Sequence, residues 1–227
     1  ATLVSGGNIV LKRGMQGMDR GMLQAEGNIT AKFLENCKVR CKGMLKADAI
    51  LHSDVECQEN VDILGKKGLI NGGSLSTYAD VHATTLGSMC ASTKIKIISD
   101  KELIIRANEI KEEVENKEET LRKIDEVVNR VKGQLASNQE VLPEQMNYLK
   151  QATVNKPLLV KQIRELREER EKLLVRIEKN KHSCIRVEGA VYSGIDITVK
   201  DVSKIQHEQV SHCRFVRDGA DVRIVGL

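Results

Sequence analysis

The first 99 residues repeat themselves: Gly7-Asn-Ile9 returns twenty positions later as Gly27-Asn-Ile29, and Met22-Leu-Gln-Ala-Glu26 returns twenty-two positions later as Met44-Leu-Lys-Ala-Asp48. Short runs that alternate apolar and polar residues fill the intervals, and Gly, Asn or Asp separate them. A period near 20 with β-type alternation is typical of a parallel β-solenoid. The repeat therefore predicts that residues 1–99 form the rungs of a right-handed parallel β-helix.

The amino-acid composition fits a core only a few side chains wide. Phe, Trp and Tyr together make up five of 227 residues, and Trp is absent. A broad core draws much of its buried area from aromatic rings, whereas stacked rungs can be filled by aliphatic side chains, Met and Cys. The same scarcity argues against single-stranded nucleic-acid binding, which stacks bases on aromatic rings, and against a sugar-binding cleft. The near balance of 36 basic and 32 acidic residues gives nucleic-acid binding no support.

Residues 100–182 have a different composition, with 42% charged residues against 23% elsewhere. Apolar residues recur there with the alternating steps of three and four that mark heptad positions. The first series is Leu103, Ala107, Ile110, Val114, Leu121, Ile124, Val128, Val131 and Leu135. The second series is Met146, Leu149, Ala152, Leu159, Ile163, Leu166, Leu173 and Ile177. Together they predict an antiparallel coiled-coil hairpin.

The two series meet at a polar connection and contain three polar breaks. Residues 136–142 read as a loop, and Pro143 suits the first turn of a second helix. Pro157 should kink or split that helix. The breaks are Lys117, Lys156 and Arg170. Antiparallel pairing predicts Lys117 near Ile163 and Arg170 near Ile110, so that each charge faces an apolar residue.

Residues 183–227 return to strand-like patterns. The expected strands are Cys184–Val187, Ala190–Tyr192, Ile195–Val199 and Val222–Val225. They are expected to pack beside the solenoid and complete it. The predicted organisation is therefore residues 1–99 as rungs, residues 100–182 as an inserted hairpin and residues 183–227 as returning strands, a mixed β and α fold.

One rival pattern lies inside the repeat region. Ile63, Leu69, Leu75 and Val81 fall six residues apart, which is the spacing of left-handed β-helices, many of them acyltransferases. Such enzymes use a histidine as general base, and His82 is the candidate here. The competing interpretation places His82 on the solvent side of an alternating strand. The six-residue run lasts about four steps and does not extend back through residues 7–50.

Other candidate sites have ordinary structural explanations. Asp54, Glu56 and Asp62 resemble a carboxylate group, but alternation alone places Asp54 and Glu56 on one outward face. Gly72-Gly73 lacks the flanking residues of a phosphate-binding loop, so corner glycines with positive φ are the better interpretation. The sequence nominates no catalytic, cofactor-binding or metal-ligating residue.

Six cysteines (Cys37, Cys41, Cys57, Cys90, Cys184 and Cys213) form no CxxC pair. Cys37 and Cys41 lie four apart in a strand-like run, too far apart for a disulfide or a shared zinc ion. Most of these thiols are expected to be small buried hydrophobic groups, which fits a reducing cytoplasm. No stretch is apolar enough to span a membrane.

The order of short motifs resembles a known family. Ile70-Asn-Gly-Gly73, Ala79-Asp-Val81 and Leu86-Gly-Ser88 precede the predicted hairpin, and Val191-Tyr-Ser-Gly-Ile195 follows it. This arrangement resembles the bacterial flagellar assembly protein A family, long a domain of unknown function. The family usually has Pro where Ser193 stands. The resemblance implies a β-helix with a coiled coil, a further N-terminal domain in full-length members and no established catalytic residues.

These observations predict a non-enzymatic structural or interaction protein, a fragment of a larger bacterial protein involved in flagellar assembly, its regulation or polymer-like scaffolding. Its expected partners are other proteins or further copies of the chain. The exposed edge of the first rung, around Val4 to Ile9, is one expected contact surface. The hairpin tip at residues 136–142 is another, because Val141 and Leu142 accompany a single charge, Glu140. The alternative function is a hexapeptide-type acyltransferase.

Overall fold

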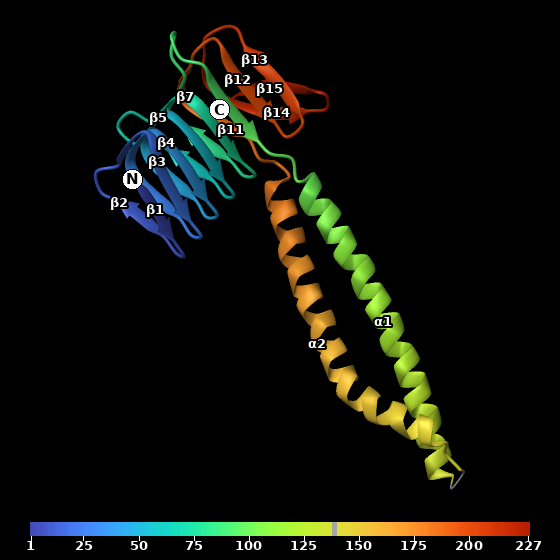
Figure 1. Cartoon of the computed structure of the whole chain (residues 1–227). Coiled ribbons are helices and arrows are strands. Elements are labelled where there is room, and N and C mark those ends of the chain that lie inside the picture. The colour runs from blue at the N-terminus through green and yellow to red at the C-terminus, as the bar shows by residue number, and fades with distance from the viewer. Residues whose placement is uncertain (138–139) are drawn as a thin grey trace. The chain divides into compact units, whose positions relative to one another are not determined.

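The computed structural model describes residues 1–137 and 140–227 and divides them into two compact units. One unit comprises residues 1–100 and 179–227, and the other comprises residues 101–178. Figure 1 shows the first unit as stacked strands and the second as two long helices. The chain is therefore a β-solenoid with a helical hairpin inserted in its sequence.

Successive turns of the solenoid hydrogen-bond in parallel, and their pairings define three faces. The strands concerned are β1 (Thr2–Ser5), β2 (Ile9–Leu11), β3 (Met15–Ala25), β4 (Ile29–Cys41), β5 (Leu45–Cys57), β6 (Val61–Ile63), β7 (Leu69–Thr77), β8 (Val81–Ala83), β9 (Thr85–Leu86), β10 (Thr93–Ile97), β11 (Ile185–Val191) and β12 (Ile195–Val199). The longest strands bend around the corners: β4 pairs with β2 on the first face and with β3 on the other two, so it contributes to all three faces.

Each face sends at least one column of mainly aliphatic side chains into the core. The first column is Ile9, Ile29, Leu45, Val61, Val81 and Ile185. The second is Met15, Leu34, Ile50, Ile70, Leu86 and Val191. The third is Leu3, Leu23, Val39, Val55, Leu75, Ile95 and Ile197. All but Leu3 are buried, which confirms the narrow aliphatic core expected from the composition.

The stacking register corrects one of the two sequence repeats. Ile9 pairs with Ile29 at the predicted offset of twenty, but Leu23 pairs with Val39 on the third face while Leu45 lies on the first. The match of residues 22–26 with residues 44–48 is therefore not a stacking repeat. Because every face needs the same alternation of buried and exposed residues, segments on different faces acquire similar sequences. The handedness of the solenoid remains a prediction.

Asparagine and aspartate side chains hold one corner of the solenoid together. The Asn8 Oδ1 accepts the Asn28 N–H at 2.7 Å, and the Asn28 Oδ1 accepts the Met44 N–H at 2.8 Å. One Asp80 carboxylate oxygen likewise accepts the Cys184 N–H at 2.8 Å. Backbone groups at a corner leave the strand ladder and need other partners, and these side chains supply them from one turn to the next.

The hairpin interrupts a single turn. Val81 pairs with Val61 twenty residues before it and with Ile185 104 residues after it. The insertion therefore adds 84 residues to an ordinary spacing of twenty. β11 then continues the first two faces and β12 the third, as expected for returning strands.

Two strands at the C-terminal end, β13 and β14, were not predicted. β13 (Val202–Gln206) pairs antiparallel with β12, and β14 (Val210–Asp218) pairs antiparallel with β11 and β15 (Asp221–Gly226). β14 also buries Phe215, a large aromatic side chain in a core otherwise built from smaller residues. These antiparallel strands end the parallel stack.

The helical unit consists of two long helices. α1 (Lys101–Ala136) and α2 (Pro143–Asn180) flank the expected loop, and Pro143 begins the second helix. Pro157 lies within α2, which is continuous, so the predicted split is wrong; Figure 1 shows a bend in the first half of α2, which contains this proline. The seam buries Ile110, Val114 and Ile163.

The polar breaks of the seam have polar partners on the opposite helix. The Lys117 Nζ donates to the Gln162 Oε1 at 3.3 Å, and the Arg170 Nε donates to the Ala107 carbonyl at 3.2 Å. Lys156 forms an ion pair with Asp125. Lys117 thus lies at the predicted level, beside Ile163, and Arg170 bonds one helical turn from the predicted Ile110. These polar partners offset the cost of placing a polar group at the seam.

Candidate functional site

His82 lies on the outward side of the first face, next to a carboxylate. Its Nδ1 is 3.2 Å from the Asp62 Oδ1, and the Lys46 Nζ is 3.9 Å from the other carboxylate oxygen. Lys46, Asp62, His82 and Arg186 are successive partners along the face. Opposite charges on adjacent strands are a common means of sheet stabilisation, so the geometry of His82 has an ordinary structural explanation.

The six-residue pattern does not describe the stacking. A left-handed hexapeptide helix needs eighteen residues per turn, three faces of six. The offsets on the first face are sixteen from Ile29 to Leu45 and from Leu45 to Val61, then twenty from Val61 to Val81. The acyltransferase alternative thus loses the sequence pattern that suggested it.

The candidate carboxylates and the Gly72-Gly73 pair also have structural roles. Asp54 and Glu56 are both exposed, as alternation predicted; the Ser74 hydroxyl donates to Asp54 at 2.8 Å and the Arg40 Nε donates to Glu56 at 3.1 Å. Gly72 and Gly73 have φ of 72° and 79°, which confirms their interpretation as corner glycines.

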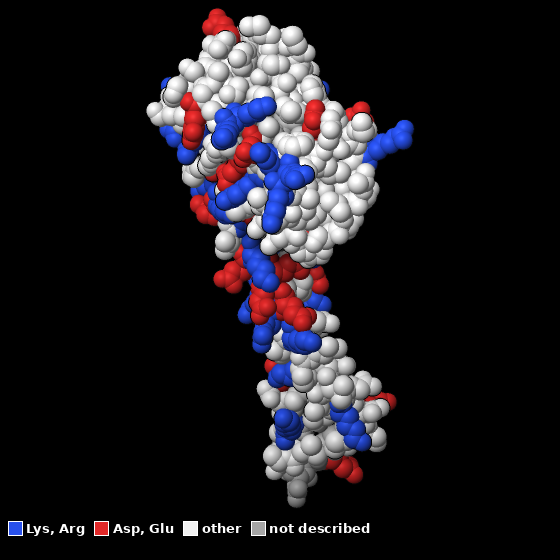
Figure 2. Space-filling model, turned by 90° about the vertical axis from the view of Figure 1, so that its left-hand side faces the viewer, with Lys and Arg blue, Asp and Glu red and all other residues white. Residues whose placement is uncertain are grey.

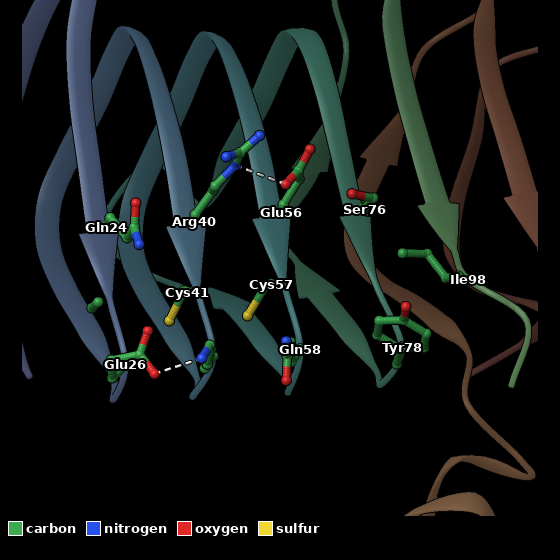
Figure 3. A pocket seen from close by; sticks show the side chains of 12 residues that line it. Gln24, Glu26, Arg40, Cys41, Glu56, Cys57, Gln58, Ser76, Tyr78 and Ile98 are labelled. Carbon is green, nitrogen blue, oxygen red and sulfur yellow. Dashed lines mark hydrogen bonds and ion pairs between the residues drawn. The ribbon is translucent and has the colours of Figure 1, made fainter. Parts of the chain in front are cut away.

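The most distinctive group in the solenoid is a pair of buried cysteines. Cys41 and Cys57 are directly opposite each other at the ends of β4 and β5. Figure 3 shows their sulfur atoms on neighbouring strands, pointing the same way, at a hollow of about 330 Å³. Neighbouring strands lie about 4.8 Å apart, which is within the Cα separation that a disulfide spans.

Each thiol also donates a hydrogen bond to a backbone carbonyl at the adjacent corner. The Cys41 Sγ donates to the Gly27 carbonyl at 3.2 Å, and the Cys57 Sγ donates to the Gly43 carbonyl at 3.0 Å. A thiol is a weak donor, and the Gly27 carbonyl also accepts the Gly43 N–H at 3.0 Å, so the Cys41 thiol there adds to a backbone hydrogen bond. These contacts explain why cysteine, instead of a purely aliphatic residue, stands at both positions.

The two thiols differ in acidity because they lie side by side. Hydrogen bonding by the Cys57 thiol lowers the pKa of Cys41 to about 7, against the opposing effect of burial. The same hydrogen bond, together with burial, raises the pKa of Cys57. Of the two thiols, Cys41 is therefore the one that loses its proton more readily, although it is buried.

The rim of the hollow does not supply a catalytic base to these thiols. Glu26 forms an ion pair with Lys42 at 2.6 Å, and Glu56 forms one with Arg40 at 3.1 Å (Figure 3). Both carboxylates are committed to neighbouring cations on the outer surface. A nucleophilic enzyme orients a base toward its nucleophile, and the described residues lining the hollow show no such arrangement.

The other cysteines are consistent with the packing role expected of them. Five of the six are buried, and Cys90 is exposed. Burial raises the pKa of Cys37, Cys184 and Cys213. Among the residues that the structure describes, no three His, Cys, Asp or Glu side chains are grouped to hold a metal ion. The pairing of Cys41 with Cys57 was missed because the sequence analysis compared cysteines along one strand instead of across one turn.

Together these features define a three-faced parallel β-solenoid domain that carries a helical hairpin between two strands of one turn. The family model of the flagellar assembly protein A β-solenoid domain matches residues 1–222, and the chain belongs to this family. This membership connects the protein with a flagellar role. No curated protein and no solved structure gives a significant match. Within the described residues, neither helix has an apolar stretch long enough to cross a bilayer.

Proposed function

We propose that the protein is a non-enzymatic scaffold of the bacterial cytoplasm that binds other proteins in flagellar assembly or its regulation. Family membership supports the flagellar connection. The observation that carries the binding role is an apolar surface on the hairpin, in the part that adjoins its loop. A soluble helix ordinarily turns its large apolar side chains toward a core, so a helix that leaves them exposed is suited to a partner.

This surface, the loop-end surface, consists of large apolar residues that remain exposed between residues 135 and 160. They are Leu135, Leu142, Met146, Tyr148, Val154, Leu158 and Val160. Figure 2 shows that this part of the hairpin carries few charged atoms, whereas Lys, Arg, Asp and Glu crowd the other part. An interface core is poor in charge and rich in apolar and aromatic groups.

The predicted tip contributes to this surface. Leu142 is 64% exposed and Val141 is half-buried, while Glu140 is exposed. Residues 138 and 139 of the predicted tip lie outside the described residues. We therefore propose a partner that contacts Leu142 together with α2, a wider surface than the loop that the sequence indicated.

A substitution pair tests the location of the binding surface. Val154→Ser with Leu158→Ser should abolish capture of flagellar proteins by the immobilised chain, because both side chains are exposed on α2 within the loop-end surface. Val175→Ser is the matched control: Val175 is 65% exposed on the same helix but outside the loop-end surface. Retained capture by the double variant, at an unchanged melting temperature, would place recognition elsewhere.

Deletion of the hairpin tests the scaffold model more broadly. Replacing residues 102–179 by a short Gly-Ser linker should leave a folded solenoid, because β10 and β11 pair with other strands of their own unit. The proposal expects this protein to lose its partners. Full retention of the same partners would assign binding to the solenoid, and light scattering would separately report whether further copies of the chain are partners.

A further inference from the structure

The buried pair Cys41 and Cys57 has a feature that its hydrogen bonds do not explain, because both positions carry sulfur. The next turn shows that a hydroxyl can do the same work. Thr77 comes next in the stack after Cys57, and its Oγ1 donates to the Glu59 carbonyl at 2.6 Å. A hydroxyl is a stronger donor than a thiol. Bonding to corner carbonyls therefore accounts for a polar atom at these positions but not for two adjacent sulfur atoms.

The spacing of the two cysteines fits a bridging metal ion better than a disulfide. Cys41 and Cys57 are in-register partners of two parallel strands, so their side chains stack at the strand spacing of about 4.8 Å. A disulfide needs Cβ atoms about 3.5–4.5 Å apart, and this stacking exceeds that distance. Metal–thiolate bonds are about 2.3 Å long, the value for zinc, so two sulfurs on opposite sides of one ion lie about 4.6 Å apart. The stack therefore presents two thiols at the separation that a bridging ion requires.

The surroundings of the pair give a cation access and further oxygen atoms. Both cysteines line the hollow of about 330 Å³, from which an ion can reach them (Figure 3). The residues whose carbonyl oxygens lie within 3.4 Å of one of the two sulfur atoms are Gly27, Gly43, Met44 and Glu59. Each thiol has a single proton to donate, so these carbonyls outnumber the thiol protons. The partial negative charge of the carbonyl oxygens favours a cation beside the sulfur atoms.

The number of protein ligands indicates which ion the pair suits. Among the residues that the structure describes, the pair does not belong to any group of three His, Cys, Asp or Glu side chains that could hold a metal. Zinc takes four protein ligands in structural sites and three in catalytic sites, so two thiolates alone do not make a zinc site. Thiolates select soft ions, and Cu(I) is one of them. Because Cu(I) has a filled d shell, it accepts two ligands in a linear arrangement.

We propose that Cys41 and Cys57 bind one Cu(I) ion between two turns of the solenoid. Both thiols release their protons to solvent when the ion binds, since the ligands are thiolates. The bound ion links β4 to β5 and stabilises the folded solenoid, because it binds the folded chain in preference to the unfolded one. The site is independent of the loop-end surface of the hairpin, so failure of either proposal leaves the other untouched.

Anaerobic titration of the reduced full chain with Cu(I), in competition with a chromophoric Cu(I) chelator, tests the proposal. One tightly bound ion per chain is expected, with two sulfur neighbours in X-ray absorption and a melting temperature above that of the metal-free chain. Cys41→Ser and Cys57→Ser should each lower the affinity by about 100-fold or more, because even a residue that only orients a metal ligand contributes about 10–100-fold. Both variants should remain folded by circular dichroism, because a hydroxyl can donate to a corner carbonyl as Thr77 does.

Cys90→Ser and Cys37→Ala are the matched controls, since Cys90 is exposed and Cys37 is buried on β4 beside Ser53. Each control should bind Cu(I) with the affinity of the parent. Loss of the ion in Cys90→Ser, with retention in both variants of the pair, would show that copper binds the surface thiol and would overturn the proposal. So would the absence of a stoichiometric ion, more than two sulfur neighbours in the parent chain, or zinc binding as tight as that of Cu(I).

Discussion

The solenoid and the hairpin bury very different amounts of apolar surface for their length. In the solenoid, each inward position on three faces stacks on the next turn, and most of these side chains are fully buried. In the hairpin, Ile110, Val114 and Ile163 form the buried cluster, while ion pairs join the helices on either side. Apolar burial contributes about 25 cal/mol per Å², whereas an exposed ion pair contributes about 0–1 kcal/mol. Apolar burial thus stabilises the solenoid strongly, whereas the hairpin leaves most of its side chains in contact with solvent.

The largest expected effect comes from a cavity in the stacked core. Leu45→Ala removes a side chain that is 0% exposed and stacks between Ile29 and Val61. We expect the free energy of unfolding of the solenoid to fall by about 2–5 kcal/mol. Leu64→Ala, at a residue 46% exposed, should change it by less than about 0.5 kcal/mol. Hydrogen exchange of solenoid peptides measures both, and similar losses would contradict the stacked core.

A corner substitution should have the next largest effect. Gly73→Ala places a methyl group 2.3 Å from the Ser53 carbonyl oxygen at a φ of +79°. Gly194→Ala has a similar φ of +85° but open space around it. The left-handed backbone alone costs about 1–2 kcal/mol, so Gly73→Ala should destabilise by more than Gly194→Ala in urea unfolding. Equal destabilisation would show that the corner yields to the added methyl group.

Alkaline pH should weaken the solenoid through its buried thiols. Burial raises the pKa of Cys37 and Cys213, so these thiols stay protonated in the folded chain when the unfolded chain ionises near pH 9. Their stabilising effect is complete below pH 9 and is lost as the pH rises, by at most about 1.4 kcal/mol per pH unit and thiol.

Cys213→Ala should therefore reduce the slope of stability against pH above 9. Val187→Ala, at the residue opposite Cys213, provides a comparison without a titrating group. It should lower stability at every pH and leave the slope unchanged. Denaturant unfolding between pH 7 and 10.5 measures both slopes, and an unaltered slope in Cys213→Ala would refute the assignment.

The smallest effect is expected at the hairpin seam. A double-mutant cycle of Lys156→Ala and Asp125→Ala should give a coupling below about 1 kcal/mol, because both side chains are more than one-third exposed. The coupling should shrink as salt is added. Helix melting followed by circular dichroism at two salt concentrations measures it. A larger, salt-independent coupling would show that the seam resembles the solenoid core.

Sequence patterns predicted the features that depend on residues close together in the chain, namely the two helices and the aliphatic core. Heptad steps located both helices and the start of α2 at Pro143, and the aromatic scarcity predicted the aliphatic columns. The predicted stacking of residues 22–26 on residues 44–48 was wrong, because all three faces have the same alternation of buried and exposed residues. A further signal was present: Asn8, Asn28, Asn60 and Asp80 each precede a strand of the first face, although Met44 stands at that position before Leu45.

The candidate sites were less predictable for a physical reason. Cys41 and Cys57 become neighbours only when the turn length of sixteen is known. The antiparallel pairing of β14 with β11 likewise joins segments that lie far apart in the chain. Neither composition nor periodicity specifies how the end of a solenoid is closed.

The interruption of one turn has a consequence for the order of folding. Joining β8 to β11 directly means closing a loop of 104 residues instead of twenty, which costs about 1.4 kcal/mol more in chain entropy. If the two helices pair first, through local contacts, the ends of the insertion are already together; the Asn180 amide then lies 3.3 Å from the Asp100 carboxylate. Early pairing of the helices would thus shorten the loop that the last solenoid turns must close. In a kinetic experiment, α-helix formation would precede the pairing of β8 with β11.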